Sequence, residues 1–135
     1  MTNDEKQILF IDLCARLPYG VKGLHRNQIQ RLLVIDSFGS YQMNGYNAWF
    51  NLYSIEFKPY LRPMSSMTEE EKKEFDEFVC VDEEAWKGDS IQGFLNQAEI
   101  MSDGIDWLNK KMFDYRGLIP MGLALEAPED MYKED

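Results

Sequence analysis

Few residues in this sequence could carry metal or nucleophilic chemistry. His25 is the only histidine, which excludes a site built from several histidines and leaves a single candidate for a histidine base. Because His25 lies in the polar stretch 23–28, we expect a solvated loop side chain. Cys14 and Cys80 lie far apart in apolar helical patterns, so we expect two buried free thiols in a reducing compartment, with neither a disulfide nor a zinc site.

The carboxylates are numerous but show no catalytic spacing. Glu69, Glu70 and Glu71 stand where a helix should begin, and acidic residues there favour the positive end of the helix dipole. Residues 82–84 lack the spacing of a calcium loop. Neither a phosphate-binding nor a dinucleotide-binding glycine motif occurs. We therefore predict no catalytic residue, no metal and no cofactor, although a magnesium site assembled from separated carboxylates stays open.

The segment 57–64, FKPYLRPM, combines basic and aromatic residues in an otherwise acidic chain. In an extended segment, alternation places Lys58, Tyr60 and Arg62 on one face. Pro59 and Pro63 remove backbone donors, so we expect this segment at an edge of the sheet or at an exit from it. Arginine and tyrosine are enriched at binding hot spots, which makes the three residues a candidate protein-binding site. In the alternative interpretation, the two basic residues pair with carboxylates of the following helix.

A second candidate segment is FDYRGLIPMGLALEAP at residues 113–128. Tyr115 and Arg116 are its candidate binding residues, because they stand among apolar pairs and glycines without a clear period. The alternative interpretation is a return loop that lines the core.

Residues 58–75 and 106–128 together resemble segments of short uncharacterised proteins of gut Bacteroidetes genomes and their phages. These segments cover about 40 of the 135 residues. The resemblance implies a phage or mobile-element origin. It implies no activity, cofactor or catalytic residue.

The elements that would position these residues follow from local patterns. Thr2 and Glu5 match a capping box that begins a helix over about 3–17, and Pro18 ends it. Residues 29–38 and 49–57 have strand composition, residues 19–24 form a weaker strand, and the Asn44-Gly45 pair between the two good strands favours a turn.

The remainder of the chain has helical patterns. The first helix starts at Ser66 or Thr68 and should bury Phe75 and Phe78 against the sheet; others begin at Ser90 and near residue 103. The tail from about 128 should fray. We predict a single α+β domain over residues 1–135: an N-terminal helix, a small antiparallel sheet of about three strands, and three or so C-terminal helices packed on one face of the sheet.

Composition narrows the classes of partner. A formal net charge of −10 and a pI of about 4.5 repel nucleic-acid phosphates and anionic membranes. The sequence contains no apolar stretch of about 20 residues and no basic, apolar leader pattern. We expect a cytoplasmic protein whose partner is another protein, with no direct binding of nucleic acid or membrane.

The leading hypothesis is a small non-enzymatic protein-binding or accessory domain. One alternative is an acidic inhibitor that mimics DNA and acts on a host nucleic-acid enzyme, but Lys72, Lys73, Lys110 and Lys111 interrupt the acidic surface that a mimic needs. A second alternative is an enzyme with a site of scattered carboxylates.

Removal of divalent cations should leave the fold intact. The sequence has enough apolar residues for a core, since 44% are hydrophobic, and it has no dedicated set of metal ligands. We expect the same melting temperature with and without excess chelator, measured by circular dichroism. A fall of several degrees that one divalent ion restores would reveal a carboxylate site.

Overall fold

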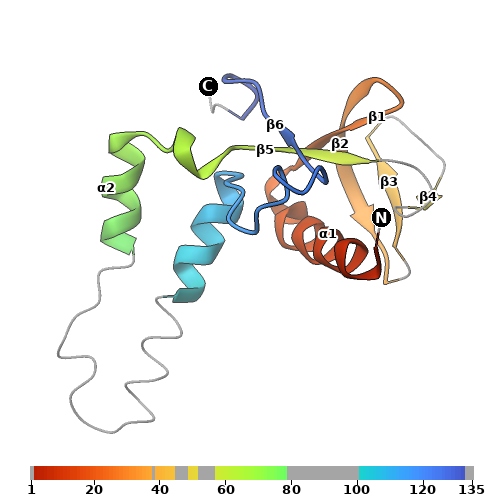
Figure 1. Ribbon diagram of the computed structural model, residues 1–135, viewed down its shortest axis with the longest axis horizontal. Helices are drawn as coiled ribbons and strands as arrows, with labels where there is room; N and C mark the ends of the chain where they lie inside the picture. Colours follow the sequence, from red (N-terminus) through yellow and green to blue (C-terminus); the bar gives the residue numbers. More distant parts are fainter. Residues whose placement is uncertain (1, 38, 45–48, 52–56, 79–100, 133–135) are drawn as a thin grey trace, which may run out of the picture.

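The computed structural model describes residues 2–37, 39–44, 49–51, 57–78 and 101–132 (Figure 1). The predicted helix from Ser90 lies outside these ranges, as does Cys80. The described residues contain three helices and six strands. In chain order they are α1 (Asn3–Arg16), the 3-10 turn Leu17–Tyr19, β1 (Lys22–His25), β2 (Gln28–Ile35), β3 (Ser40–Met43), β4 (Phe50–Asn51), β5 (Lys58–Leu61), the 3-10 turn Met64–Ser66, α2 (Glu69–Phe78), helical residues 101–110 and β6 (Leu125–Glu126).

Helix α1 begins at the predicted capping box. The Thr2 hydroxyl accepts from the Glu5 backbone N–H at 3.1 Å, and the Glu5 carboxylate accepts from the Thr2 N–H at 3.1 Å. The helix turns Leu9 and Leu13 into the core. The expectation for Cys14 is wrong, because this side chain is exposed. The buried face of α1 runs through Asp12 and Arg16 instead, since these polar residues have partners there.

The sheet is larger and more mixed than the sequence predicted. Its strand order is β4-β3-β2-β1-β5-β6. Neighbouring strands are antiparallel except β5 and β6, which run parallel. The additional strands include β3, which lies between the two strands predicted at 29–38 and 49–57, and β6, a two-residue strand in the C-terminal segment. Both form by pairing with partners that local sequence patterns do not identify.

The hairpin between β1 and β2 corrects the prediction for His25. Arg26 and Asn27 have positive φ angles of 50° and 65°, so they form the two-residue turn. His25 is therefore the last residue of β1 and pairs with Gln28. Alternation along β1 points its ring inward with Val21 and Gly23, and the side chain is fully buried. The predicted loop, which began at residue 23, thus starts three residues before the observed turn at Arg26.

Strand β5 is not at an edge, because it lies between β1 and β6. Its pairing with β1 is short: Pro59 stands opposite Gly23 and Lys58 opposite Leu24. Beyond this point the Tyr132 hydroxyl accepts from the Lys22 N–H at 2.9 Å and donates to the Tyr60 carbonyl at 2.8 Å. A side chain thus supplies backbone hydrogen bonds where the two strands separate.

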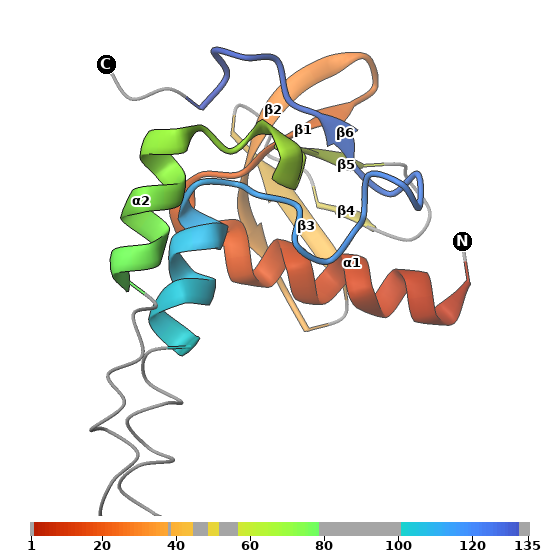
Figure 2. The ribbon, with the colours of Figure 1, turned by 60° about the vertical axis from the view of Figure 1, so that its left-hand side comes forward.

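Two apolar clusters support the fold. The larger one joins α1 to the inner face of the sheet, which includes Leu32, Tyr41 and Leu61, and it also includes Leu118 and Leu123. In the smaller cluster, Phe75 of α2 packs on Trp107 with ring centroids 5.4 Å apart. Helix α2 thus packs on the helical residues 101–110 and not on the sheet as predicted (Figure 2). The side chain of Phe78 lies outside the described part.

The buried histidine should make stability depend on pH. The Tyr41 hydroxyl lies 2.9 Å from His25 Nδ1, and burial, with Arg26 nearby, lowers the pKa of His25 below its usual 6.5. The unfolded chain then binds more protons just below pH 6.5, so the free energy of unfolding should fall as the pH drops through this range. Urea titrations at pH 7 and pH 5.5 should show this loss in the native sequence and a smaller loss in His25→Gln. Equal losses would contradict the assignment.

Candidate functional site: the outer sheet face and a buried arginine network

Lys58 and Tyr60 lie on the face of β5 that points away from the core. Both are half-buried, whereas Pro59 and Leu61, which alternate with them, are buried. This alternation agrees with the predicted arrangement for the first two residues of the candidate strip.

Arg62, the third residue of the candidate strip, is bound to side chains of other segments. Its guanidinium binds the Glu71 carboxylate through two hydrogen bonds of 2.8 and 2.7 Å and lies 4.2 Å from the centroid of the Phe113 ring. The hydrogen bonds from Arg62, together with those from Thr68, lower the pKa of Glu71 to about 2. For Arg62, the structure therefore shows the alternative that we left open, pairing with a carboxylate of the next helix. This pair attaches α2 to the end of β5.

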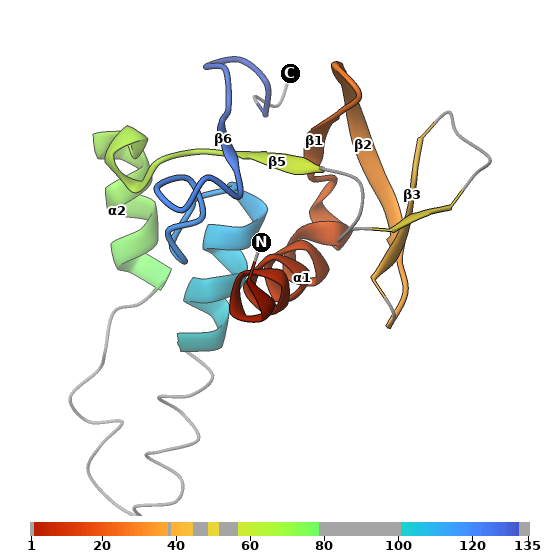
Figure 3. The same cartoon turned by 45° about the vertical axis from the view of Figure 1, so that its right-hand side comes forward.

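Lys58 and Tyr60 are part of a wider surface, which we call the outer sheet face. Strand register places Leu24 between Lys58 on β5 and Ile29 on β2, and it places Lys22 opposite Arg31. Helix α1 lies on the other side of the sheet, where it packs on the inward residues (Figure 3). The outer sheet face consists of Lys22, Leu24, Ile29, Arg31, Leu33, Lys58 and Tyr60.

The apolar residues of this face on β2 are unusually accessible. Ile29 is 51% exposed and Leu33 is 45% exposed. The register shifts between Leu32 and Val34, and such a bulge re-aims side chains of the bulged strand. Ile29 and Leu33 were not predicted as site residues, because residues 29–38 were identified only as a strand and its two faces were not distinguished. The period-two alternation of Ile29, Arg31 and Leu33 with Gln30 and Leu32 was the available signal.

Tyr115 and Arg116 take part in a different group, at the C-terminal end of α1. The Arg116 guanidinium donates to the Asp12 carboxylate at 2.7 Å. The Tyr115 hydroxyl donates to Asn109 at 2.8 Å. The Tyr115 ring has two arginines beside it: the guanidinium carbons of Arg116 and Arg16 lie 4.6 and 5.3 Å from its centroid.

The centre of this group is a buried ion pair. Arg16 Nε donates to the Asp12 carboxylate at 2.9 Å, and both side chains are 0% exposed. Arg16 Nη2 donates to the Phe113 carbonyl at 2.6 Å, while Nη1 has no hydrogen-bond partner among the described residues. One carboxylate thus accepts from two guanidinium groups. These contacts hold residues 113–116 against α1.

The rest of the second candidate segment lines the core. The buried Asp114 carboxylate accepts from the backbone N–H groups of Leu118 and Ile119 at 2.8 and 2.9 Å. This shapes a turn that inserts Leu118 and Leu123 into the larger apolar cluster. The alternative interpretation of a core-lining return loop is therefore correct for these residues.

Other kinds of site find no support in the described ranges. Among those residues, no three of His, Cys, Asp and Glu are grouped so that they could hold a metal ion. The same residues include no helix that is both long and apolar enough to cross a bilayer.

Comparison of the chain with protein-family models, with curated proteins and with solved structures gives no match.

The buried ion pair should be essential for stability. Asp12→Asn keeps the size of the side chain but leaves two guanidinium groups without their counter-charge, so the free energy of unfolding should fall by about 3–5 kcal/mol. Arg116→Gln is the matched control and should cost less, because the Arg116 side chain is 23% exposed. Urea denaturation monitored by circular dichroism gives both values. Equal losses for the two variants would contradict a buried centre at Asp12.

Proposed function

We propose that this chain is a small non-enzymatic protein-binding or accessory domain whose contact surface is the outer sheet face. The observation that carries the proposal is the exposure of Ile29 and Leu33, at 51% and 45%, on strand β2, which is paired on both sides. Exposed apolar groups on a rigid element suit the buried centre of an interface. The neighbouring Arg31 and Tyr60 are of the residue types that are enriched at interface hot spots.

The charges on this face indicate what kind of protein would bind. The whole chain has a net charge of −10, yet Lys22, Arg31 and Lys58 share one face of the sheet. A partner with an acidic rim around an apolar centre would complement it, and the charges would mainly increase the association rate. Nucleic acid would also meet these residues, but the field of the remaining chain repels phosphates. A phage or mobile-element setting, as the resemblance implies, is part of the proposal.

The two alternatives have less support from the described residues. A DNA mimic needs carboxylates without intervening cations, whereas Lys72 lies 3.2 Å from Glu69 on α2 and Lys73 is exposed beside it. An enzyme with scattered carboxylates needs acids that converge on accessible space. Asp12 and Asp114 are buried, and their oxygens accept from arginines and backbone N–H groups.

Crosslinking in the organism that encodes the chain can test this surface. A photo-crosslinking amino acid at position 33 should yield a defined protein adduct, whereas the same group at position 72 on α2 should not. Adding Ile29→Asp to the position-33 protein should abolish the adduct, because a new carboxylate disrupts the apolar centre. The melting temperature should change little, since Ile29 is 51% exposed.

A matched control keeps the outcome specific. Gln28→Asp introduces the same charge one residue away, on the opposite face of the strand, and should leave the adduct intact. Equal adducts at positions 33 and 72, an adduct that survives Ile29→Asp, or an adduct sensitive to nuclease would each contradict the proposal.

A further inference from the structure

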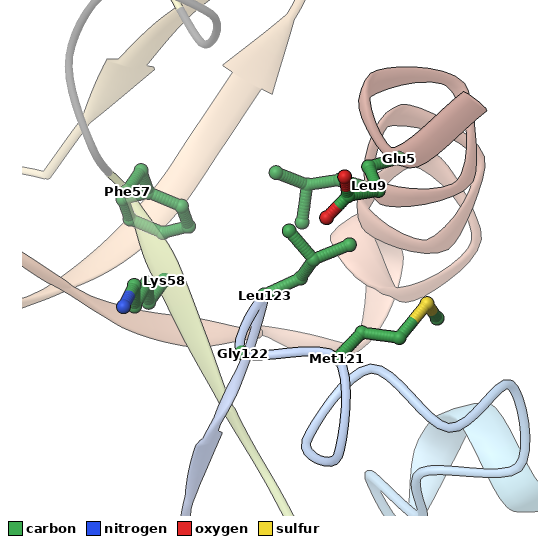
Figure 4. Close-up of a pocket in the computed structure, with 7 residues that line it drawn as sticks. All are labelled: Glu5, Leu9, Phe57, Lys58, Met121, Gly122 and Leu123. Atoms are coloured by element: carbon green, nitrogen blue, oxygen red, sulfur yellow. The ribbon is translucent and has the colours of Figure 1, made fainter. Parts of the chain in front are cut away.

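A small pocket lies on the inner side of β5, away from the outer sheet face. Its volume is about 180 Å³. It is formed where the N-terminal half of α1, the start of β5 and the turn at 121–123 approach one another (Figure 4). The lining residues are Glu5, Leu9, Phe57, Lys58, Met121, Gly122 and Leu123.

Three apolar side chains form part of the pocket wall. Leu9, Phe57 and Leu123 come from three separate segments, and each is buried with at most 6% exposure. A cavity of roughly 150 Å³ lined by such residues can hold benzene, whereas drug-sized ligands need roughly 300 Å³ or more. The pocket therefore suits a single ring or a branched aliphatic group. Met121 at the rim is 40% exposed, and its flexible thioether can adapt to an occupant.

Glu5 and Lys58 are the two charged residues among those that line the pocket, and their charged groups are placed differently. In Figure 4 the Glu5 carboxylate lies on the side of α1 that faces Leu123, while the Lys58 nitrogen points away from the cavity. The capping box fixes the carboxylate, because Glu5 Oε1 accepts from the Thr2 N–H at 3.1 Å. Its hydrogen bonds with Thr2 also lower the pKa of Glu5, so it is ionised at neutral pH. A positioned carboxylate thus lies beside the three apolar side chains of the pocket.

We propose that this pocket binds a small organic amine with a ring-sized apolar body. The apolar body would occupy the space between Leu9, Phe57 and Leu123, and the ammonium group would donate to the Glu5 carboxylate. Such a charge-assisted hydrogen bond is stronger than a neutral one. The inference uses the opposite side of β5 from the outer sheet face and is independent of the proposed function.

The test compares two probes of similar shape and opposite charge. Phenethylamine and 3-phenylpropionate should each be titrated into the full chain and followed by ¹H–¹⁵N correlation spectra. We expect phenethylamine to give saturable shifts at the amides of Leu9, Phe57 and Leu123, with an affinity at least about tenfold higher than that of 3-phenylpropionate. No saturable shift, or equal affinity for the two probes, would overturn the proposal.

Two charge variants identify the carboxylate that selects the amine. Glu5→Gln removes the charge but keeps the helix cap, because glutamine can serve at this position of a capping box. It should weaken phenethylamine binding about tenfold and remove the preference over 3-phenylpropionate. Glu70→Gln is the control, because it removes the same charge from an exposed position on α2 that does not line the pocket, and it should leave phenethylamine binding unchanged. Wild-type affinity in Glu5→Gln, or an equal effect of Glu70→Gln, would overturn the proposal.

Discussion

The carboxylate of Asp12 connects parts of the chain that are far apart in sequence. An isolated charge at 0% exposure would be very unfavourable, and Asp12 is tolerated there because Arg16 and Arg116 both donate to it. Arg16 also donates a hydrogen bond to the Phe113 carbonyl. The backbone of Phe113 in turn forms an isolated parallel β-bridge with that of Arg62. Since Arg62 also binds Glu71, one network runs from α1 through the C-terminal segment to β5 and α2.

Local signals in the sequence predicted those elements that depend on neighbouring residues. The Thr2 and Glu5 capping box, the strand around Leu32, and the alternation of Lys58 with Tyr60 all act within a few residues. Gly117, with a positive φ of 77°, is likewise a residue type that favours this backbone conformation. Each of these features follows from backbone geometry that a short stretch of sequence specifies.

The errors arose where distant segments decide the outcome. Strand β6 exists because it pairs with β5 across more than 60 residues of chain, and β5 is internal for the same reason. His25 is buried because the two-residue turn begins after it. Cys14 is exposed because Asp12 and Arg16 take the buried face of α1, and their partners lie about 100 residues away. The i, i+4 spacing of Asp12 and Arg16 was a visible sign of an ion pair, but it did not show that the pair is buried.

Strand β5 serves both proposed surfaces through its simple alternation. Phe57 faces the pocket beside α1, and the next residue, Lys58, faces the opposite side of the sheet. Strand β5 pairs with β1 at only two positions. Even so, it separates the pocket, which contains the Glu5 carboxylate, from the outer sheet face, which contains three basic residues.

The Tyr132 hydroxyl bridges the backbones of β1 and β5, so this bridge can form only after residue 132 has been synthesised. It bonds to Lys22, 110 residues earlier, and to the carbonyl of Tyr60. Domains emerge from the ribosome N-terminal end first, so β1 and β5 leave the ribosome well before the side chain that bridges them. Until residue 132 has emerged, the Lys22 N–H and the Tyr60 carbonyl lack the partner that they have in the folded chain, and water must take its place. The bridge between the two strands is therefore the last of these contacts to form.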